Sequence, residues 1–219
     1  MGPYTEHFFP WFIEKVLSLP VYREQRREIL RRAEGRVLEI GFGFGGTLTE
    51  YPSARVLEVV ALEPNPGMVR RARRSTAKAP FPVRFVRGVA EAMPFPDGRF
   101  DTVVSNWTLC SLDRLPEALD EIRRVLTAGG RLLFLEHGLS DEPRLARWQR
   151  FLTPVQRVLA GGCRLDLDIE AVVRSGGFRI ESLERYESGL PLRVLRQMYR
   201  GVARPDVPRT GVDSGRELK

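Results

Sequence analysis

An acidic residue followed at once by a cluster of glycines has the composition of a cofactor-binding loop. Glu39 ends an apolar run, and the next seven positions contain Gly41, Gly43, Gly45 and Gly46. Glycine is favoured where a backbone turns with positive φ or approaches a ligand closely. The spacing fits both the G-x-G-x-x-G pattern of dinucleotide-binding loops and the G-x-G-x-G pattern of another cofactor loop. The glycines alone leave the cofactor undecided.

Two carboxylates narrow the choice. Glu39 lies two residues before Gly41, where dinucleotide loops usually carry an apolar residue. A carboxylate there would repel a pyrophosphate and stabilise a positively charged ligand. Glu63 ends the next apolar run, at the distance from the loop where an acid accepts hydrogen bonds from a ribose diol. The first acid therefore argues against a nicotinamide cofactor, whereas the second suits either type of nucleoside.

Groups that could move a proton or act as nucleophiles are few. His137 ends a later apolar run and would lie at the edge where substrates bind in parallel sheets. Because histidine exchanges protons near neutral pH, it is a candidate base or substrate-orienting group, and His7 is a weaker candidate in the N-terminal helices. Cys110 stands in the apolar stretch "TLCSL", where we expect a buried, unreactive thiol.

These residues need a framework, and the chain supplies alternating short and long apolar patterns. The patterns predict strands at 36–40, 56–62, 83–87, 101–105 and 130–136, and helices at 46–51, 66–77, 114–126 and 168–175. Strands nearly continuous in Val, Leu and Ile are typical of a parallel sheet covered by helices on both faces. Two late strands, 178–188 and 192–205, predict an antiparallel end to a doubly wound α/β fold, which disfavours a second mononucleotide-binding half.

Four parts are expected along the chain. Residues 1–34 carry two helical patterns and form a lid, and residues 35–204 form the α/β domain. Within it, 143–163 is an inserted amphipathic segment on the substrate side, bent near Pro154. Residues 205–219 lack a core-forming pattern, so we expect a disordered tail. The apolar positions of the inserted segment are Leu145, Trp148, Phe151, Leu152, Val155, Val158 and Leu159.

Composition bounds the partners. A chain of 219 residues with 42% hydrophobic residues suits one domain, and its net charge of +7 comes almost wholly from arginine. The arginines form no continuous block, so we expect no nucleic-acid partner. No apolar run approaches the roughly 20 residues of a membrane span, which predicts a soluble cytoplasmic monomer or homodimer without stable membrane insertion. Cys110 and Cys163 are too few for a disulfide framework and too isolated for a zinc site, so no metal is expected.

Four successive motifs carry a resemblance to a known family. The stretches "VLEIGFGFGGTL", "ALEPNPGMVRRA", "RGVAEAMPFPDGRFDTVVSNWTLCSL" and "LDEIRRVLTAGGRLLFLE" resemble, in order and spacing, those of class I S-adenosylmethionine-dependent methyltransferases. The match runs from about Gly35 to Glu136, roughly half of the chain. It implies a Rossmann-like, seven-stranded sheet, mostly parallel with an antiparallel C-terminal hairpin. It also implies S-adenosyl-L-methionine as the cofactor.

The resemblance assigns roles to particular positions. It implies that the glycine loop packs against the methionine portion of the cofactor, that Glu39 helps to hold its amino group and that Glu63 holds the ribose. Many relatives carry an aspartate where this chain has Val89, so either the Glu91 side chain or backbone near Ala90 must bind the adenine amine. The implied cofactor-binding residues are Glu39, Gly41, Gly43, Gly45, Glu63, Pro64, Asn65, Met68, Ala90, Glu91, Asn106 and Trp107.

The methyl acceptor is a small molecule in this interpretation. Methyl transfer from a sulfonium is an in-line displacement, which requires alignment and exclusion of water more than a base. The stretches "NWTLCSL" and "LFLEHG" and a W-x5-P…GGC run are similar to thiol S-methyltransferases, which implies a thiol. Those relatives carry an N-terminal membrane anchor, which we do not expect here. Lipophilic quinone precursors and phospholipid head groups stay open, as do a nicotinamide-dependent oxidoreductase and a non-catalytic cofactor-binding protein.

Overall fold

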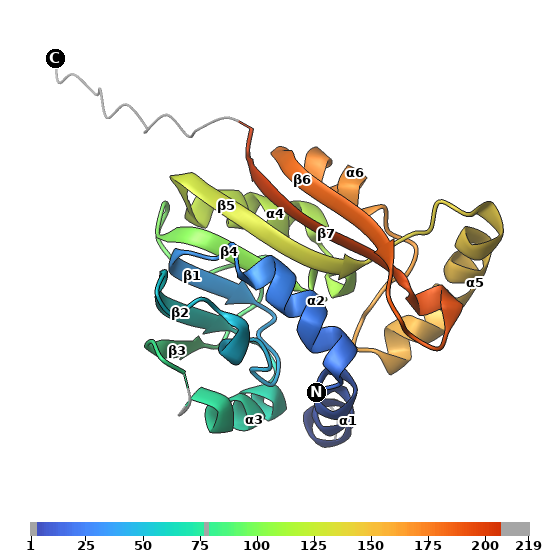
Figure 1. Cartoon of the computed structure of the whole chain (residues 1–219), viewed down its shortest axis with the longest axis horizontal. Helices are drawn as coiled ribbons and strands as arrows, with labels where there is room; N and C mark the ends of the chain where they lie inside the picture. Colours follow the sequence, from blue (N-terminus) through green and yellow to red (C-terminus); the bar gives the residue numbers. More distant parts are fainter. Residues whose placement is uncertain (1–3, 77–78, 207–219) are drawn as a thin grey trace, which may run out of the picture.

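A seven-stranded sheet forms the centre of the computed structural model, which describes residues 4–76 and 79–206 (Figure 1). The strands lie in the order β3-β2-β1-β4-β5-β7-β6, and β7 runs antiparallel to both of its neighbours, whereas the other pairs are parallel. The predicted doubly wound sheet with an antiparallel C-terminal hairpin is confirmed. The strands are β1 (Gly35–Ile40), β2 (Val56–Leu62), β3 (Val83–Val86), β4 (Phe100–Asn106), β5 (Leu126–His137), β6 (Phe178–Glu187) and β7 (Gln197–Pro205).

Helices cover both faces of the sheet because alternate side chains of each buried strand are apolar. Val37 packs in a cluster with Ile29 and Leu30 on one face, while Leu38 packs in a second cluster with Ile122 and Ile169 on the other. The covering helices are α2 (Pro20–Leu30) and α3 (Pro66–Thr76) on the first face, and α4 (Leu115–Val125) and α6 (Ile169–Ser175) on the second. Figure 1 shows α2 crossing in front of the sheet, with α4 and α6 behind it.

Two predicted elements are wrong in the structure. The expected helix at 46–51 is only a single 3₁₀ turn, η2 (Leu48–Glu50), because side chains on both sides of it turn inward to a buried carboxylate described below. The expected strand at 192–205 begins only at Gln197, since residues 193–195 form another 3₁₀ turn, η4 (Arg193–Leu195). The first difference matters for the site, because the glycine loop stays compact and the segment that follows it is fixed by these side-chain contacts.

The segment expected at 143–163 forms helix α5 (Pro143–Leu159), with Pro154 inside it. Most of its apolar side chains are exposed, including Trp148 and Phe151. The helix is anchored instead through Gln149, which is fully buried. Its amide oxygen accepts from the Ser140 N–H at 2.8 Å, and its amide nitrogen donates to two backbone carbonyls at 3.0 and 3.1 Å. A polar contact therefore fixes the helix to the sheet edge.

The N-terminal elements lie at the carboxyl ends of the parallel strands. A π-helical turn, η1 (Tyr4–Phe8), leads into α1 (Phe9–Leu17), which lies beside α3 in Figure 1. The Tyr4 hydroxyl donates to the Leu159 carbonyl at 2.9 Å and so joins this turn to the end of α5. Pro205 still belongs to β7, and the Asp206 N–H donates to the Gly177 carbonyl at 3.0 Å, whereas residues 207–219 of the expected tail lie outside the described residues.

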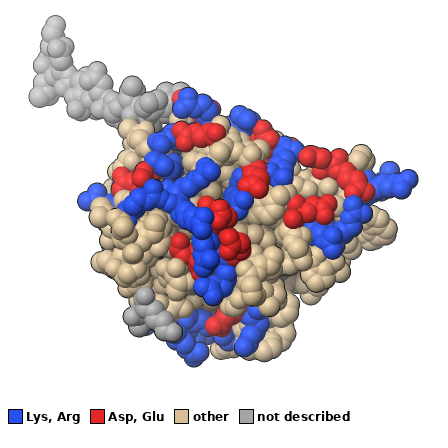
Figure 2. Space-filling view, in the orientation of Figure 1, with Lys and Arg blue, Asp and Glu red and all other residues tan. Residues whose placement is uncertain are grey.

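Surface charges of opposite sign are mixed. On the face in Figure 2, lysine and arginine side chains are interspersed with aspartate and glutamate. Several of the contacts are ion pairs, such as Arg27 with Glu50 at 2.9 Å and Arg204 with Glu181 at 2.7 Å. Among the described helices, none is long and apolar enough to cross a membrane.

Candidate active site

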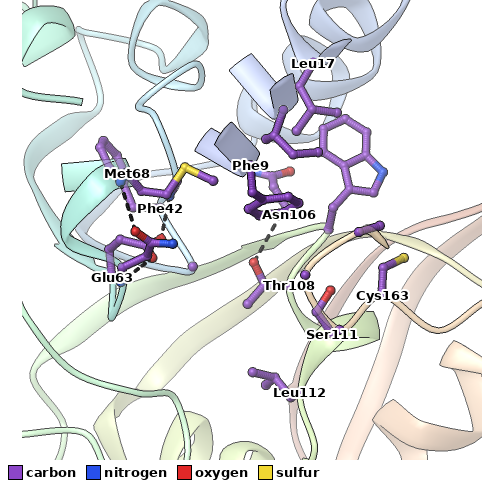
Figure 3. A pocket seen from close by; sticks show the side chains of 18 of the residues that line it. Phe9, Leu17, Phe42, Glu63, Met68, Asn106, Thr108, Ser111, Leu112 and Cys163 are labelled. Carbon is purple, nitrogen blue, oxygen red and sulfur yellow. Dashed lines mark hydrogen bonds between the residues drawn. The ribbon is translucent and has the colours of Figure 1, made fainter. Parts of the chain in front are cut away.

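A cavity of about 880 Å³ opens at the carboxyl ends of β1, β2, β4 and β5, beneath α1 (Figure 3). It brings together the glycine loop, the acid after β2 and the loop after β4, as expected for parallel strands that end at one edge. All of the predicted cofactor-binding residues line it except Gly45, and so does the candidate base His137. His7 is exposed and lies outside this lining.

The glycines of the loop do different work. Gly43 has a φ of +62°, and a Cβ added there would meet nothing nearer than the Gly41 carbonyl oxygen at 3.8 Å. A side chain at this position would therefore project into open cavity. Gly41 instead packs against Thr108, and Gly45 would press a Cβ against Ala72 of α3, at 3.4 Å. Gly45 thus serves packing between the loop and a helix and does not reach the ligand space.

One oxygen of the Glu39 carboxylate already accepts two hydrogen bonds within the protein. It is 1% exposed, and its Oε2 accepts from the hydroxyls of Thr47 and Tyr51, both at 2.8 Å. Its Oε1 lies 3.5 Å from the amide nitrogen of Asn106. Burial raises the pKa of Glu39 to about 7, against these hydrogen bonds that favour the ionised form. The Thr47 and Tyr51 contacts also explain why the segment between them does not form a helix.

Two unsatisfied side-chain atoms adjoin this carboxylate. The Oδ1 of Asn106 is buried and has no hydrogen-bond partner among the described residues. The Nε of Arg26, a residue of α2 that is 3% exposed and lines the cavity, is likewise unpaired there. Burial lowers the pKa of Arg26, while the charge of Glu39 acts in the opposite direction. The cavity thus offers two acceptors and a cation within one small region.

Arg26 was not among the predicted site residues. Its guanidinium stands 5.9 Å from the ring centroid of Trp107. The stretch "REQRRE" contains three arginines, and nothing in their types separates them. A helical period through Tyr22 and Ile29, both buried, would have placed Arg26 on the inward face of α2.

Trp107 is held in an unusual backbone conformation. Its φ is +50°, the only positive value among the described residues other than glycine. Its ring packs edge-on against Tyr22 at 5.3 Å between centroids, and its Nε1 is buried without a partner among the described residues. Left-handed backbone at a large aromatic residue costs energy and is often retained at binding sites. This backbone conformation directs the Trp107 side chain toward the cavity.

Glu63 bridges the two first loops. Its Oε2 accepts from the Gly43 N–H and its Oε1 from the Asn65 N–H, each at 2.8 Å. It is 6% exposed, and burial raises its pKa while these two bonds lower it. Figure 3 shows it beside Met68, on the opposite side of the cavity from Cys163. The acid is therefore fixed by the backbone of the glycine loop and by its own turn.

The loop after β4 is organised by Glu136, which the sequence analysis did not assign to the site. This side chain is fully buried at the end of β5. It accepts from the Ser105 hydroxyl at 2.6 Å and from the N–H groups of Thr108, Leu109 and Cys110 at 3.1 to 3.2 Å. Burial raises its pKa and the four bonds lower it. The Glu136 carboxylate thus holds the backbone of the loop that carries Trp107 in place.

Two cysteines and a histidine meet at the far end of the cavity. The Sγ atoms of Cys110 and Cys163 are 3.6 Å apart, although 53 positions separate them in the chain. The Sγ of Cys163 lies 3.8 Å from Nδ1 of His137. Hydrogen bonding from Cys110 and the adjoining His137 hold the pKa of the Cys163 thiol below its usual range, against burial. Cys110 is buried as expected, but the two thiols are not isolated from one another.

The sheet order, the glycine loop and the acids at one cavity define a class I S-adenosylmethionine-dependent methyltransferase. Residues 38–134 match the family model described as a methyltransferase domain. The human thiol S-methyltransferase TMT1B is 31% identical over 198 residues, which cover 84% of this chain and 80% of that protein. The chain belongs to this family and is an enzyme with S-adenosylmethionine as its cofactor.

One further relative matches a smaller part of the chain, and one solved structure matches its fold. The demethylmenaquinone methyltransferase of Deinococcus radiodurans is 35% identical over 129 residues, covering 57% of this chain and 54% of that protein, so the chain spans about half of its length. The crystal structure of YcgJ from Bacillus subtilis superposes with a TM-score of 0.59 at 20% identity, covering 90% of this chain and 95% of that one. The last comparison supports the fold alone.

The residues around the cavity fit this cofactor. The space in front of Gly43 admits a ligand at van der Waals distance from the backbone. Glu39 and the unpaired Asn106 oxygen suit an ammonium group, and the unpaired Arg26 nitrogen suits a carboxylate. These are the two charged groups of the methionine portion. The fit rests on Asn106 Oδ1 and Arg26 Nε, which have no hydrogen-bond partner among the described residues, and on Glu39 Oε1, which has only the long 3.5 Å contact with Asn106.

Proposed function

We propose that this chain methylates a small thiol. The observation that carries the proposal is the extent of the likeness to thiol S-methyltransferase TMT1B, over 84% of the chain. The match to the methyltransferase-domain model covers only residues 38–134, whereas the likeness to TMT1B extends over 84% of the chain. The likeness to TMT1B is therefore not confined to the cofactor side. It must include residues after β5, which form the acceptor side of the cavity.

The cofactor side has assigned roles in this proposal. Glu39 and Asn106 hold the amino group, Arg26 pairs with the carboxylate, and Glu63 accepts hydrogen bonds from the ribose hydroxyls. Glu91 lines the cavity and is the candidate for the adenine amine. S-adenosylmethionine supplies an electrophilic methyl group on a sulfonium. The protein's task is then to align the acceptor and to exclude water.

The acceptor side is apolar and suits a lipophilic thiol. Its walls come from α1, from the end of α5 and from the β4 loop, and comprise Phe9, Phe12, Ile13, Val16, Leu17, Trp107, Leu112, Val158 and Leu159. Cysteine has a thiol pKa near 8.5, and an aryl thiol is more acidic, so a fraction of it is already thiolate at neutral pH, whereas a simple alkyl thiol is less acidic and must lose its proton in the site. In the transfer, the sulfur lone pair forms the new bond to carbon, and the electrons of the broken S–CH₃ bond return to the cofactor sulfur. The thiol proton goes to His137 or to solvent.

A quinone precursor is the second candidate acceptor. The partial likeness to the Deinococcus radiodurans demethylmenaquinone methyltransferase supports it, as do the apolar walls of the cavity. That likeness covers 57% of this chain, against 84% for the thiol enzyme. A phospholipid head group fits less well, because Arg157, a cation at this end of the cavity, is already paired with Asp113 at 2.7 Å and the other walls are largely apolar.

The test is S-adenosylhomocysteine release from purified protein with a panel of acceptors. Small alkyl and aryl thiols, a demethylquinol, phenols and amines are compared at equal concentration, with the Gly43→Val variant as the inactive control. The proposal expects thiols to be methylated at least about tenfold faster than the others. Turnover of the quinol with none of the thiols would overturn it in favour of the second candidate.

A further inference from the structure

Cys110, His137 and Cys163 form a cluster that the proposed cofactor contacts leave unused. Their ligand atoms, two Sγ and an imidazole nitrogen, all lie within 4.8 Å of one another. His137 and Cys163 line the cavity, while Cys110 is fully buried behind them. Three such donors at the wall of a substrate cavity are the usual protein ligands of a catalytic zinc site.

Two of the three separations agree with a shared tetrahedral metal, and the third, between Cys110 Sγ and the imidazole nitrogen, lies within 4.8 Å. Bonds of about 2.3 Å to sulfur and about 2.05 Å to nitrogen at tetrahedral angles place two sulfurs about 3.8 Å apart and a sulfur and a nitrogen about 3.6 Å apart. The observed separations are 3.6 Å between the sulfurs and 3.8 Å between the Cys163 sulfur and the His137 Nδ1. We propose that Cys110, His137 and Cys163 bind a zinc ion, whose fourth coordination position faces the cavity.

The backbone holds the three ligands in place before any ion binds. Cys110 lies in a turn whose N–H groups are anchored by Glu136, next to His137 at the end of β5. The carbonyl of Cys110 accepts from the Arg164 N–H at 2.8 Å, which joins the segment of one cysteine to that of the other. Gly162, with a φ of +98°, permits this approach, because a Cβ there would come within 2.7 Å of the Ser111 carbonyl oxygen.

The charges around the cluster also suit a divalent cation. Two thiolates and a neutral imidazole leave a bound Zn²⁺ without net charge, so the occupied site avoids the cost of an isolated buried ion. Glu136 adds negative charge near Cys110, and Tyr22 lies close to Cys163. Cys163 also has a polar neighbour in Gln156, from the last turn of α5. Zinc is favoured over calcium or magnesium, which prefer oxygen ligands.

The open position suits the acceptor, and this step rests on the proposed function. A thiol that binds there coordinates through sulfur as its thiolate and releases its proton to solvent, because a coordinating thiol is deprotonated by zinc. The ion would then hold the acceptor sulfur on the wall of the cavity that also contains the cofactor loop. With His137 bound to the ion, its imidazole is not available as the proton acceptor considered above, and the ion takes the place of a general base.

Metal binding can be measured without any turnover. Protein purified under reducing conditions and stripped with a chelator is titrated with Zn²⁺ against a chromophoric competitor, and with Co²⁺ to read thiolate-to-metal absorption. We expect one equivalent of either ion, with the cobalt spectrum of a tetrahedral thiolate site. Cys110→Ala, His137→Ala and Cys163→Ser should each weaken zinc binding by more than about 100-fold, beyond the 10- to 100-fold typical of outer-shell changes. Ser175→Ala is the control and should bind as the parent does, because Ser175 is exposed on α6 and its hydroxyl donates to the Val172 carbonyl of the same helix.

The outcomes separate the two proposals. Absence of stoichiometric binding, equal zinc affinity in all variants, or a Cys110–Cys163 disulfide that persists in the reducing buffer would overturn the zinc site. If zinc binds but thiols are not methylated, the proposed acceptor fails and the metal site stands. If thiols are methylated at an unchanged rate by metal-free protein, the site's link to the acceptor fails alone. Circular dichroism and thermal unfolding confirm that each variant retains the fold, and His137→Ala changes the least buried of the three ligands.

Discussion

Replacing Glu39 with glutamine tests whether a buried carboxylate holds the cofactor's ammonium group. In the protein without ligand, burial raises the pKa of Glu39 to about 7 from an ordinary 4.5. Ionising this group in the fold therefore costs about 3 kcal/mol more than in water. A bound ammonium offsets that cost, so cofactor binding should require the ionised form.

The expected result is a pH dependence with a defined sign. Affinity for the product S-adenosylhomocysteine, which carries the same amino group, should rise with pH up to about 7 and then level off. At pH 5.5 a carboxyl with a pKa near 7 is about 3% ionised, which corresponds to roughly 30-fold weaker binding than on the plateau. The ligand's own amino group stays protonated between pH 5.5 and 7.5, because the adjacent carboxylate raises its pKa above the ordinary value of about 8 for a peptide α-amino group, so this range is the useful window.

Isothermal titration calorimetry at fixed ionic strength measures this dependence. Glu39→Gln should bind at least about tenfold more weakly at pH 7.5 and vary little across the window. Glu117→Gln, an exposed acid on α4, should retain the parent's slope. His137→Ala and Glu63→Gln control for two other side chains that line the cavity. A flat profile in the parent, or a slope that persists in Glu39→Gln, would refute the assignment.

Three further predictions concern single side chains. Glu63→Ala should weaken cofactor binding by about 1 to 3 kcal/mol, because it leaves the Gly43 and Asn65 N–H groups and the ribose hydroxyls without an acceptor. If calorimetry shows unchanged affinity, Glu63 does not belong to the site. Gly43→Val should abolish detectable cofactor binding, because the valine side chain would project into the open cavity where the cofactor binds. The left-handed backbone at this position should lower stability by only about 1 to 2 kcal/mol. A loss of stability larger than the loss of binding free energy would contradict this prediction. Glu136→Ala should lower the free energy of unfolding by at least about 3 kcal/mol in urea titrations, since three backbone N–H groups lose a buried acceptor, and a loss below about 1 kcal/mol would show that this loop does not depend on the carboxylate.

The sheet could be predicted because its strands are short apolar runs whose ends are visible in the sequence itself. β2 has the predicted bounds, and β1 starts one residue earlier than predicted. Prediction failed where a tertiary contact decided the backbone. Residues 46–51 have a helical pattern, but Thr47 and Tyr51 are drawn to Glu39, and the helix is lost.

The cofactor side of the cavity was predictable for a related reason. Its residues stand in four short stretches at the carboxyl ends of β1, β2, β3 and β4, so the chain order alone brings them to one edge. Arg26 and Glu136 were missed because only the rotation of α2 and the closure of the β4 loop make them part of the site. The meeting of Cys110 with Cys163 depends on how α5 returns to the sheet, which no local pattern contains.

The two sides of the cavity are coupled through one carboxylate. Glu136 binds the N–H groups of the loop that carries both Trp107, which faces the cofactor region, and Cys110, which belongs to the cysteine cluster. The next residue along β5 is His137, the third member of that cluster. A shift of this loop would therefore move the wall beside the cofactor and the acceptor end together. Because the carboxylate is fully buried and accepts four hydrogen bonds, such a shift is costly, and the distance between methyl donor and acceptor is set by the fold before either ligand arrives.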